Sequence, residues 1–146
     1  MNKVYRQKPL APDEYVGRVE ADGKVYESRF GPDKYVGRVE LDNGKIYEAR
    51  LGPDKYIGQV TLDNGKIYHQ KFLAPDKYLG SVDGDGKMFR HKPLAADEYL
   101  GKIVEMTSYA HGGAAFLLLL WPMVEEQLKA EAEEKAQKEA EKKEGK

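Results

Sequence analysis

Hydrophobic and polar residues alternate along most of this chain in a pattern that recurs every 20 to 22 residues. The segment GPDKYVGRVELDNGKIYEARL at residues 31–51 is followed directly by GPDKYIGQVTLDNGKIYHQKF at residues 52–72. In each unit, two short runs rich in Val, Ile and Tyr flank an Asn-Gly or Asp-Gly pair. This arrangement is the strongest local signal for a β-hairpin. The pattern therefore predicts tandem β-hairpins.

Four units open with the phrase Pro-Asp-x-Tyr-x-Gly, and a variant of it, Ala-Asp-Glu-Tyr-Leu-Gly, starts at Ala96. The Pro-Asp pair suits a type I turn between one hairpin and the next. An aromatic residue at the same strand position in every unit predicts cross-strand packing. The predicted repeat core consists of Tyr15, Tyr26, Tyr35, Tyr47, Tyr56, Tyr68, Tyr78, Phe89 and Tyr99. The alternative use of these aromatic rings is a platform that binds a carbohydrate or a peptide.

The register of the hairpins follows if residues 42–44, Asp-Asn-Gly, form a three-residue loop. Val39 then faces Tyr47, and Arg38 faces Glu48. Since side chains alternate along a strand, this register predicts one apolar face and one mostly charged face. The predicted apolar face carries Tyr35, Gly37, Val39, Leu41, Tyr47, Ala49 and Leu51, and the predicted charged face carries Val36, Arg38, Glu40, Ile46, Glu48 and Arg50.

The repeats begin and end in the middle of a unit. Residues 2–10 resemble the second half of a unit, and residues 98–106 resemble the first half. The chain is thus predicted to be all-β, an up-and-down meander of about five tandem hairpins with ten short strands. Pairing of the first strand with the last would close a ring and remove both exposed edges. An open sheet is the alternative, because in this register Arg6 would face Lys102, a like-charge pair.

The composition changes after residue 106. Residues 109–113, Tyr-Ala-His-Gly-Gly, predict a flexible joint, and residues 114–124 form an apolar segment without a charge. Eleven residues are short for a membrane crossing, which needs about 20. We expect the segment to pack on or inside the sheet; a partner or a membrane surface is the alternative. The residues predicted to make these contacts are Phe116, Leu117, Leu118, Leu119, Leu120 and Trp121.

Three regions follow from this reading. Residues 1–106 form the hairpin-repeat domain, residues 107–124 the glycine joint with the apolar segment, and residues 125–146 a charged helical tail. Pro122 suits the first position of the tail helix, and Glu125 and Glu126 favour that start through the helix dipole.

Charge and composition narrow the function classes. The chain has 24 Lys and Arg against 25 Asp and Glu, and the balance gives no basic excess for nucleic acid. Cysteine is absent, so disulfides and thiolate chemistry are excluded. The first ten residues lack the apolar core of a signal peptide, which predicts a cytoplasmic protein, with membrane association as an open alternative.

The sequence shows no constellation of catalytic residues, so no enzyme activity, cofactor or metal is expected. The histidines, His69, His91 and His111, lack the spacing of a metal site. Residues 83–86, Asp-Gly-Asp-Gly, resemble the start of a calcium-binding loop, but Leu94 stands where that loop needs a glutamate. No nucleophile elbow, P-loop or dinucleotide fingerprint occurs.

The unit is similar to the MORN repeat, a β-hairpin of similar length. The matching residues in the second copy are Tyr35, Gly37, Val39, Asn43, Gly44 and Lys45, and the likeness covers residues 2–106. The resemblance implies scaffolding, protein binding or lipid contact rather than catalysis. The sequence thus predicts a non-enzymatic structural or protein-interaction module. The alternatives are a peripheral membrane protein anchored through residues 114–124, and a binder of carbohydrate or peptide.

Overall fold

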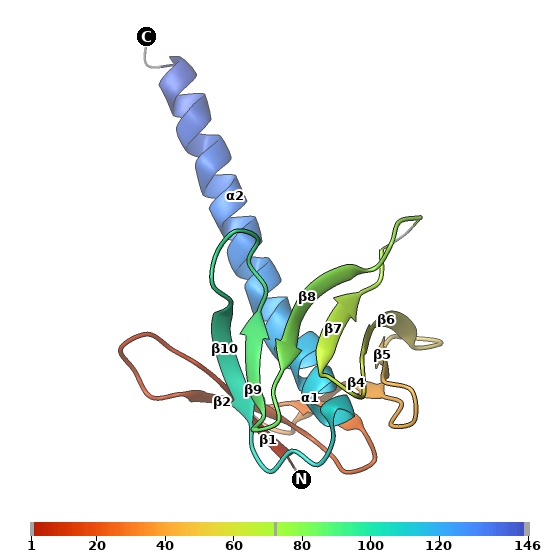
Figure 1. Ribbon diagram of the computed structural model, residues 1–146. Helices are drawn as coiled ribbons and strands as arrows, with labels where there is room; N and C mark the ends of the chain where they lie inside the picture. The colour runs from red at the N-terminus through yellow and green to blue at the C-terminus, as the bar shows by residue number, and fades with distance from the viewer. Residues whose placement is uncertain (1, 72, 145–146) are drawn as a thin grey trace.

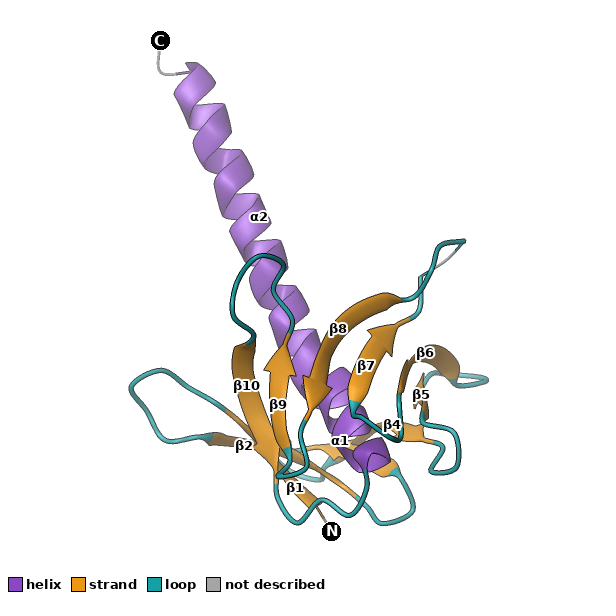
Figure 2. Cartoon of the chain, in the orientation of Figure 1, coloured by secondary structure: helices purple, strands orange, loops and turns teal. Residues whose placement is uncertain are grey.

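Ten antiparallel strands form a closed up-and-down barrel, and a C-terminal helix runs through it and out of one end (Figures 1 and 2). The computed structural model describes residues 2–71 and 73–144. The outer limits expected for the repeat domain and the tail, residues 1 and 146, lie outside these ranges. The first strand pairs with the last, so the closed arrangement is confirmed and the open sheet is excluded.

The strands are short and evenly spaced. Their bounds are β1 Asn2–Arg6, β2 Glu14–Val19, β3 Lys24–Glu27, β4 Lys34–Val39, β5 Lys45–Glu48, β6 Lys55–Val60, β7 Lys66–His69, β8 Lys77–Val82, β9 Lys87–Arg90 and β10 Glu98–Ile103. Tight turns join β2 to β3, β4 to β5, β6 to β7 and β8 to β9, and longer linkers join the hairpins to one another.

The observed register differs from the predicted one by a single residue. Val39 lies opposite Ile46, and Arg38 opposite Tyr47, because the loop contains four residues and closes with a bond from the Glu40 N–H to the Lys45 carbonyl, 2.8 Å. A slip of one residue turns a whole strand over. Ile46 is therefore fully buried inside the barrel, whereas Tyr47 lies on the outer wall, and the predicted faces of β5 are wrong.

A bulge in the first strand of each hairpin explains why the tyrosines there also point outward. Gly37 lies opposite Val25, but Tyr35 lies opposite Tyr26, so Val36 is the extra residue. Val36 and Val39 both contact the core, whereas Tyr35 stacks outside on Tyr26. Gly37 faces the central helix, and a Cβ there would meet the Leu118 side chain at 2.9 Å. The alternation of a regular strand does not predict this local reversal.

The seam between β1 and β10 follows the same shifted register. Arg6 lies opposite Gly101, and Lys102 lies opposite Tyr5 with its Nζ 5.8 Å from the ring centre. The expected pairing of Arg6 with Lys102 is therefore wrong. The buried Asn2 side chain donates to the Val104 carbonyl at 3.1 Å and also to that of Glu105. The seam is thus closed by polar contacts instead of being opened by like charges.

A continuous helical rod occupies the interior, and no flexible joint precedes it. It comprises α1 Tyr109–Ala115, a wider π-helical turn η1 Phe116–Leu120, and α2 Trp121–Glu144. Gly112 and Gly113, which were expected to form a joint, are buried within α1. Their added Cβ atoms would collide with Val82 and Val60 of the wall. Glycine is present because the helix and wall approach closely, a tertiary need that outweighs its poor helix propensity.

Pro122 lies inside the rod, one residue after α2 begins, and not at the start of a separate helix. Proline lacks the N–H that an α-helix needs and its ring crowds the preceding turn. The π-helical turn precedes it, and the Trp121 N–H bonds to the Phe116 carbonyl five residues back. The wider turn accommodates the proline without ending the helix.

The apolar segment fills the barrel. Every residue from Ala110 to Trp121 is buried, and the inward side chains of the strands surround them. Interior placement is one of the two arrangements, on or inside the sheet, that the sequence predicts. Residues 125–142 of α2 are exposed, and the helix projects away from the barrel (Figure 1). In the described part of the chain, no helix has the length and apolar character needed to cross a membrane.

Candidate functional site

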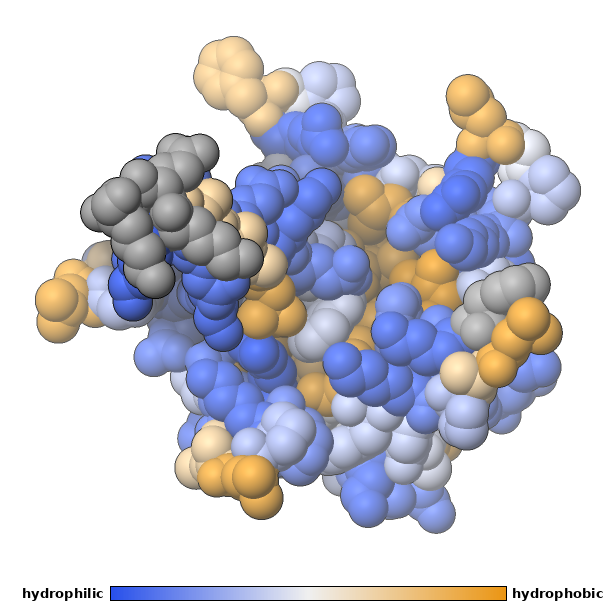
Figure 3. Space-filling view, turned by 90° about the horizontal axis from the view of Figure 1, so that it is seen from above, coloured by the Kyte–Doolittle hydropathy of each residue, from blue (hydrophilic) through white to orange (hydrophobic). Residues whose placement is uncertain are grey.

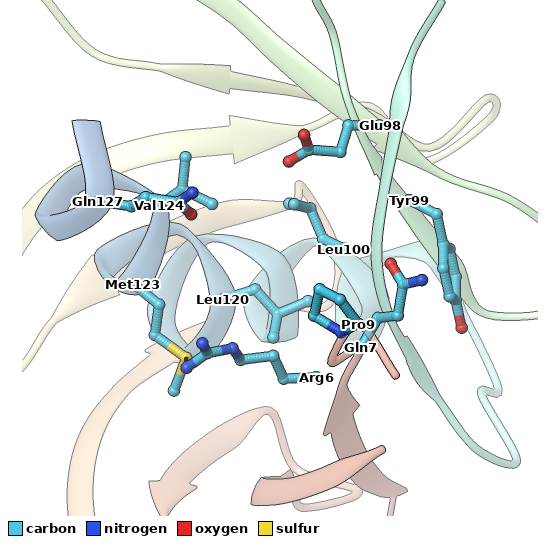
Figure 4. Close-up of a pocket in the computed structure, with 10 residues that line it drawn as sticks. All are labelled: Arg6, Gln7, Pro9, Glu98, Tyr99, Leu100, Leu120, Met123, Val124 and Gln127. Carbon is cyan, nitrogen blue, oxygen red and sulfur yellow. Dashed lines mark hydrogen bonds between the residues drawn. The ribbon is translucent and has the colours of Figure 1, made fainter. Parts of the chain in front are cut away.

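The two ends of the barrel differ, and we name them by their connections. The turn end carries the hairpin loops 20–24, 40–45, 61–66 and 83–87. The linker end carries the linkers 7–13, 28–33, 49–54, 70–76 and 91–97, of which residue 72 lies outside the described ranges. The rod enters at the turn end, where the His111 Nε2 lies 3.2 Å from the Ala21 carbonyl. It leaves at the linker end, where Met123, Gln127 and Pro9 border the same groove (Figure 4).

The aromatic residues expected in the core pair on the outer wall instead. Each ring of one hairpin stacks on a ring of the next, with centroids 5.5 to 5.7 Å apart. The pairs are Tyr5–Tyr15, Tyr26–Tyr35, Tyr47–Tyr56, Tyr68–Tyr78 and Phe89–Tyr99. The rings lie at 50° to 58° to one another, a tilted geometry that aromatic pairs favour.

Charged side chains cover two of these pairs. The Arg18 guanidinium lies 4.3 Å above the centre of the Tyr26 ring, and Arg38 lies at the same distance above Tyr47. Burial raises the pKa of Tyr35, and the nearby Asp54 carboxylate adds to the effect. The rings thus make intramolecular contacts on their faces, which leaves less of each face to serve as a ligand platform.

The second strand of each hairpin (β1, β3, β5, β7 and β9) ends at the linker end, and in four of them the last residue borders a hollow beside α2. Sequence alignment of the repeats places Arg6, Glu27, Glu48, His69 and Arg90 at this position. Glu27 and Glu48 border one hollow beside Pro122, and His69 borders another beside Trp121. Burial lowers the pKa of His69, whereas Glu125 of α2 acts in the opposite direction. The rim is therefore acidic on one side and basic on another.

One groove of the linker end lies beside Arg6, at the seam of the barrel. Its volume is about 390 Å³, within the range of small-ligand sites. It is lined by Arg6, Gln7, Pro9, Glu98, Tyr99, Leu100, Leu120, Met123, Val124 and Gln127 (Figure 4). The Arg6 Nη1 lies 3.3 Å from the Met123 Sδ. The groove thus combines an apolar floor from the strands and rod with polar groups at its edge.

The linkers themselves present apolar side chains to solvent. Five of these side chains are at least 89% exposed: Leu10, Phe30, Leu51, Leu73 and Leu94, which we call the linker tips. In three linkers the tip has a positive φ of 55° to 61°, and in two others a glycine with positive φ follows it. Figure 3 shows apolar side chains at separate corners of the outline on this side of the molecule. The tips therefore form separate protrusions.

Sequence reasoning missed both features. The tips were hidden because Leu51 was assigned to the apolar face of a strand, although it stands in a linker. The available signal was a large apolar residue one or two positions after Lys or Arg in every linker. The groove had no sequence signal, because its lining comes from both ends of the chain.

The residues whose side chains are best suited to catalysis or metal binding have structural roles. At the turn end the buried His111 lies 2.9 Å from the Ser108 Oγ through its Nδ1, but neither residue borders the seam groove or the hollows beside Pro122 and Trp121. Within residues 2–71 and 73–144, His, Cys, Asp and Glu form no group suited to a metal ion. The Asp83 carboxylate instead accepts the N–H groups of Asp85 and Lys87. These contacts explain the Asp-Gly-Asp-Gly segment as a turn.

Fold and site together define a ten-stranded barrel filled by its own helix, with a groove at its seam and projecting linkers. Comparison of the chain with protein-family models, with curated proteins and with solved structures finds no match in any of the three. The resemblance to the MORN repeat therefore stays a prediction.

Proposed function

We propose that this protein is a non-enzymatic interaction module that binds another protein through the linker tips. The observation that carries the proposal is the near-complete exposure of a large apolar side chain in every one of the five linkers. Scattered apolar residues on a surface are ordinary, but the same exposure at one position of every repeat is a pattern. A partner that covers the tips would gain about 1.5–3 kcal/mol for each one buried.

Charge favours a protein partner over an anionic membrane. In four linkers the basic residue pairs with an acidic one: Lys8 with Glu14, Arg29 with Glu27, Arg50 with Glu48, and Lys92 with Glu98. A surface without a cationic excess gains little from anionic lipid.

Shape supports the same choice. The linkers that carry the tips stand around α2, which projects between them and carries interspersed Glu and Lys (Figure 1). A flat bilayer that touched every tip would have to admit this charged helix, which is unfavourable in hydrocarbon. The other membrane mode, an anchor at residues 114–124, would require the rod to leave the barrel, because these residues are mostly buried there.

The test replaces the five tips together by serine in the full chain. Proteins from the native cell are captured by the wild type and by this variant, and retained proteins are quantified by mass spectrometry. The matched control carries Leu41→Ser and Leu62→Ser at the turn end, where these leucines are 42% and 37% exposed. We expect proteins held by the wild type and the control to be lost from the tip variant.

Vesicle flotation separates the membrane alternative. We expect no flotation of the wild type with vesicles of neutral lipid or of neutral lipid mixed with phosphatidylserine. Equal capture by all three proteins, or flotation that depends on the tips, would contradict the proposal.

A further inference from the structure

We propose that the groove at the seam of the barrel binds the C-terminal end of an extended peptide, with the terminal carboxylate on Arg6. The inference rests on the proposed function in one respect, that the partner is a protein. It uses residues other than the linker tips, so the two can be tested separately.

Arg6 differs from every other arginine of the chain in its ionic partners. The chain has arginines at positions 6, 18, 29, 38, 50 and 90. Five of them lie within 4.0 Å of a carboxylate oxygen: Arg18 on Glu20 and Asp33, Arg29 on Glu27, Arg38 on Asp54, Arg50 on Glu48, and Arg90 on Glu98. In the part of the chain that the structure describes, Arg6 has no such ion pair.

The contact that Arg6 does make is weak. Its Nη1 donates to the Met123 thioether at 3.3 Å, and sulfur is a poor acceptor. The guanidinium has five N–H donors in a planar fork. Donors therefore remain to receive a carboxylate in the two-point geometry that arginine prefers.

The acidic residues near Arg6 are engaged or lie farther along the groove. Lys8 pairs with Glu14, the residue opposite Arg6 in β2. This contact lowers the pKa of that carboxyl group, and the charge of Arg6 adds a smaller effect in the same direction. Glu98 lies 2.9 Å from Lys92 and 3.7 Å from Arg90. Glu126 borders a neighbouring hollow together with Arg6. Arg6 thus balances the charge of one peptide carboxylate, whereas Glu126 would repel further acidic residues of the peptide.

The rest of the groove suits the last residues of a peptide. Leu100, Leu120 and Val124 provide an apolar surface for the terminal side chain (Figure 4). The amides of Gln7 and Gln127 can donate to and accept from a peptide backbone. A second hollow shares Arg6, Met123 and Gln127 and continues along α2 to Ala130. A chain entering along α2 would have its end at Arg6.

The site occurs once per barrel although the fold repeats. The equivalent residues of the next two hairpins, Glu27 and Glu48, are anionic and pair with Arg29 and Arg50. His69 follows, and Arg90 is paired with Glu98. The departure of Arg6 from this pattern is the specific feature that predicts a carboxylate ligand.

The experiment titrates the full chain with an acetylated tetrapeptide, Gly-Ser-Gly-Leu, that has either a free C-terminal carboxylate or a C-terminal amide. Calorimetry gives the affinity, and amide chemical shifts locate the contact. We expect the acid to bind. The amide should bind more weakly by a factor of roughly ten or more, because the charged pair with Arg6 is lost. Isovalerate supplies the same carboxylate and apolar group without a backbone, and we expect it to bind more weakly than the peptide.

Two substitutions test the assignment. Arg6→Gln should weaken binding of the acid roughly tenfold or more, and Arg6→Lys should fall between it and the wild type. The matched control is Arg50→Gln, which removes an exposed arginine of linker 49–54, outside the groove, and should leave the affinity unchanged. Circular dichroism establishes that each variant is folded.

Different results would contradict different parts of the inference. No binding of the acid, equal binding of acid and amide, or an unchanged affinity in Arg6→Gln would overturn the groove assignment. Isovalerate binding as tightly as the peptide would overturn the peptide as the ligand. The five-tip serine variant should still bind the tetrapeptide, since the groove lining contains no linker tip. If that variant loses its partner proteins while Arg6→Gln retains them, the proposed function stands and the groove inference fails.

Discussion

The two ends of the barrel are built from the same repeat, yet only one of them is closed by its own chain. At the turn end each loop glycine accepts a bond from the next hairpin: Val39, Val60, Val82 and Ile103 donate to Gly23, Gly44, Gly65 and Gly86 at 2.9 to 3.0 Å. Ser108, Thr107 and the Ala21 carbonyl surround the buried His111 at the start of the rod. Polar groups at this end are therefore used within the molecule.

At the linker end the pairing between strands stops before the tips, and linker 91–97 adds one bond of its own, from the Ala95 N–H to the Lys92 carbonyl at 3.3 Å. The last bonds run from Ser28 to Val16 and from Ala49 to Val36, and the same bond recurs in the other hairpins. Beyond these bonds, ion pairs at the bases of the linkers are exposed and contribute little stability. The comparison teaches that the repeat separates two tasks: one end holds the hairpins together, and the other is free to contact a partner.

Removal of the rod should have the largest effect on this arrangement. A chain ending at residue 108 would leave the inward side chains of ten strands facing an empty interior, so we expect aggregation or no cooperative unfolding. A chain ending at residue 127 keeps the buried part of the rod and should melt within a few degrees of the wild type. Thermal melts by circular dichroism provide the measurement. A cooperative transition in the shorter chain would show that the barrel does not need its filling.

The next largest effect is expected when an interior residue of one hairpin, rather than the linker tip that follows it, is truncated. Ile46→Ala removes a fully buried side chain and should lower the free energy of unfolding by about 2–5 kcal/mol. Leu51→Ala, in the linker that follows, should change it by less than about 0.5 kcal/mol, because Leu51 contacts solvent. Urea denaturation measures both. Equal effects would mean that the register described here, with Ile46 inside, is wrong.

Substitution of two glycines tests whether the backbone is more tightly constrained at the turn end than at the linker end. Gly44 at the turn end and Gly52 in a linker have positive φ, 77° and 92°, so alanine is strained at both by about 1–2 kcal/mol. Only at Gly44 would the new Cβ also collide with a carbonyl, that of Val60; around Gly52 the space is open. Gly44→Ala should therefore be the more destabilising, by about 1 kcal/mol or more in urea denaturation. A larger effect at Gly52 would reverse the comparison.

The smallest expected effect is the pH response of His69 at the linker end. Burial lowers its folded pKa below the ordinary value of about 6.5, so the unfolded chain binds this proton at higher pH. Its contribution to stability is complete above about pH 6.5 and declines as the pH falls toward the folded pKa. Because the side chain is only partly buried, we expect a change well under about 1 kcal/mol. His69→Gln should reduce the change in the free energy of unfolding between about pH 7 and 5.5. If the pH dependence of the variant equals that of the wild type, other groups cause it.

Local pattern was enough to predict the hairpins but not their register. Both a three-residue and a four-residue loop satisfy the Asn43-Gly44 signal, and they differ in whether Tyr47 or Ile46 faces inward. The interior beside the helix accepts Ile46, whereas Tyr47 finds another ring and an arginine outside. The register was decided by the residues that pack against each strand from other parts of the chain. The sequence of one repeat does not contain this information.

The candidate site was even less accessible to prediction. Arg6 and Met123 are 117 residues apart and meet only because the barrel closes and the rod passes through it. The expected joint at Gly112 shows the same limit, because glycine reads as flexible until a wall is placed against it.

By itself, the sequence determined the hairpin unit, the number of strands and the half-unit phase that permits closure, because these depend on periodicity and turn chemistry over about 20 residues. Only the tertiary structure decided which side of each strand faces inward, that the apolar segment enters the ring as a helix, and where a groove remains. Those outcomes depend on contacts between distant segments, whose packing and polar pairing outweigh local preference.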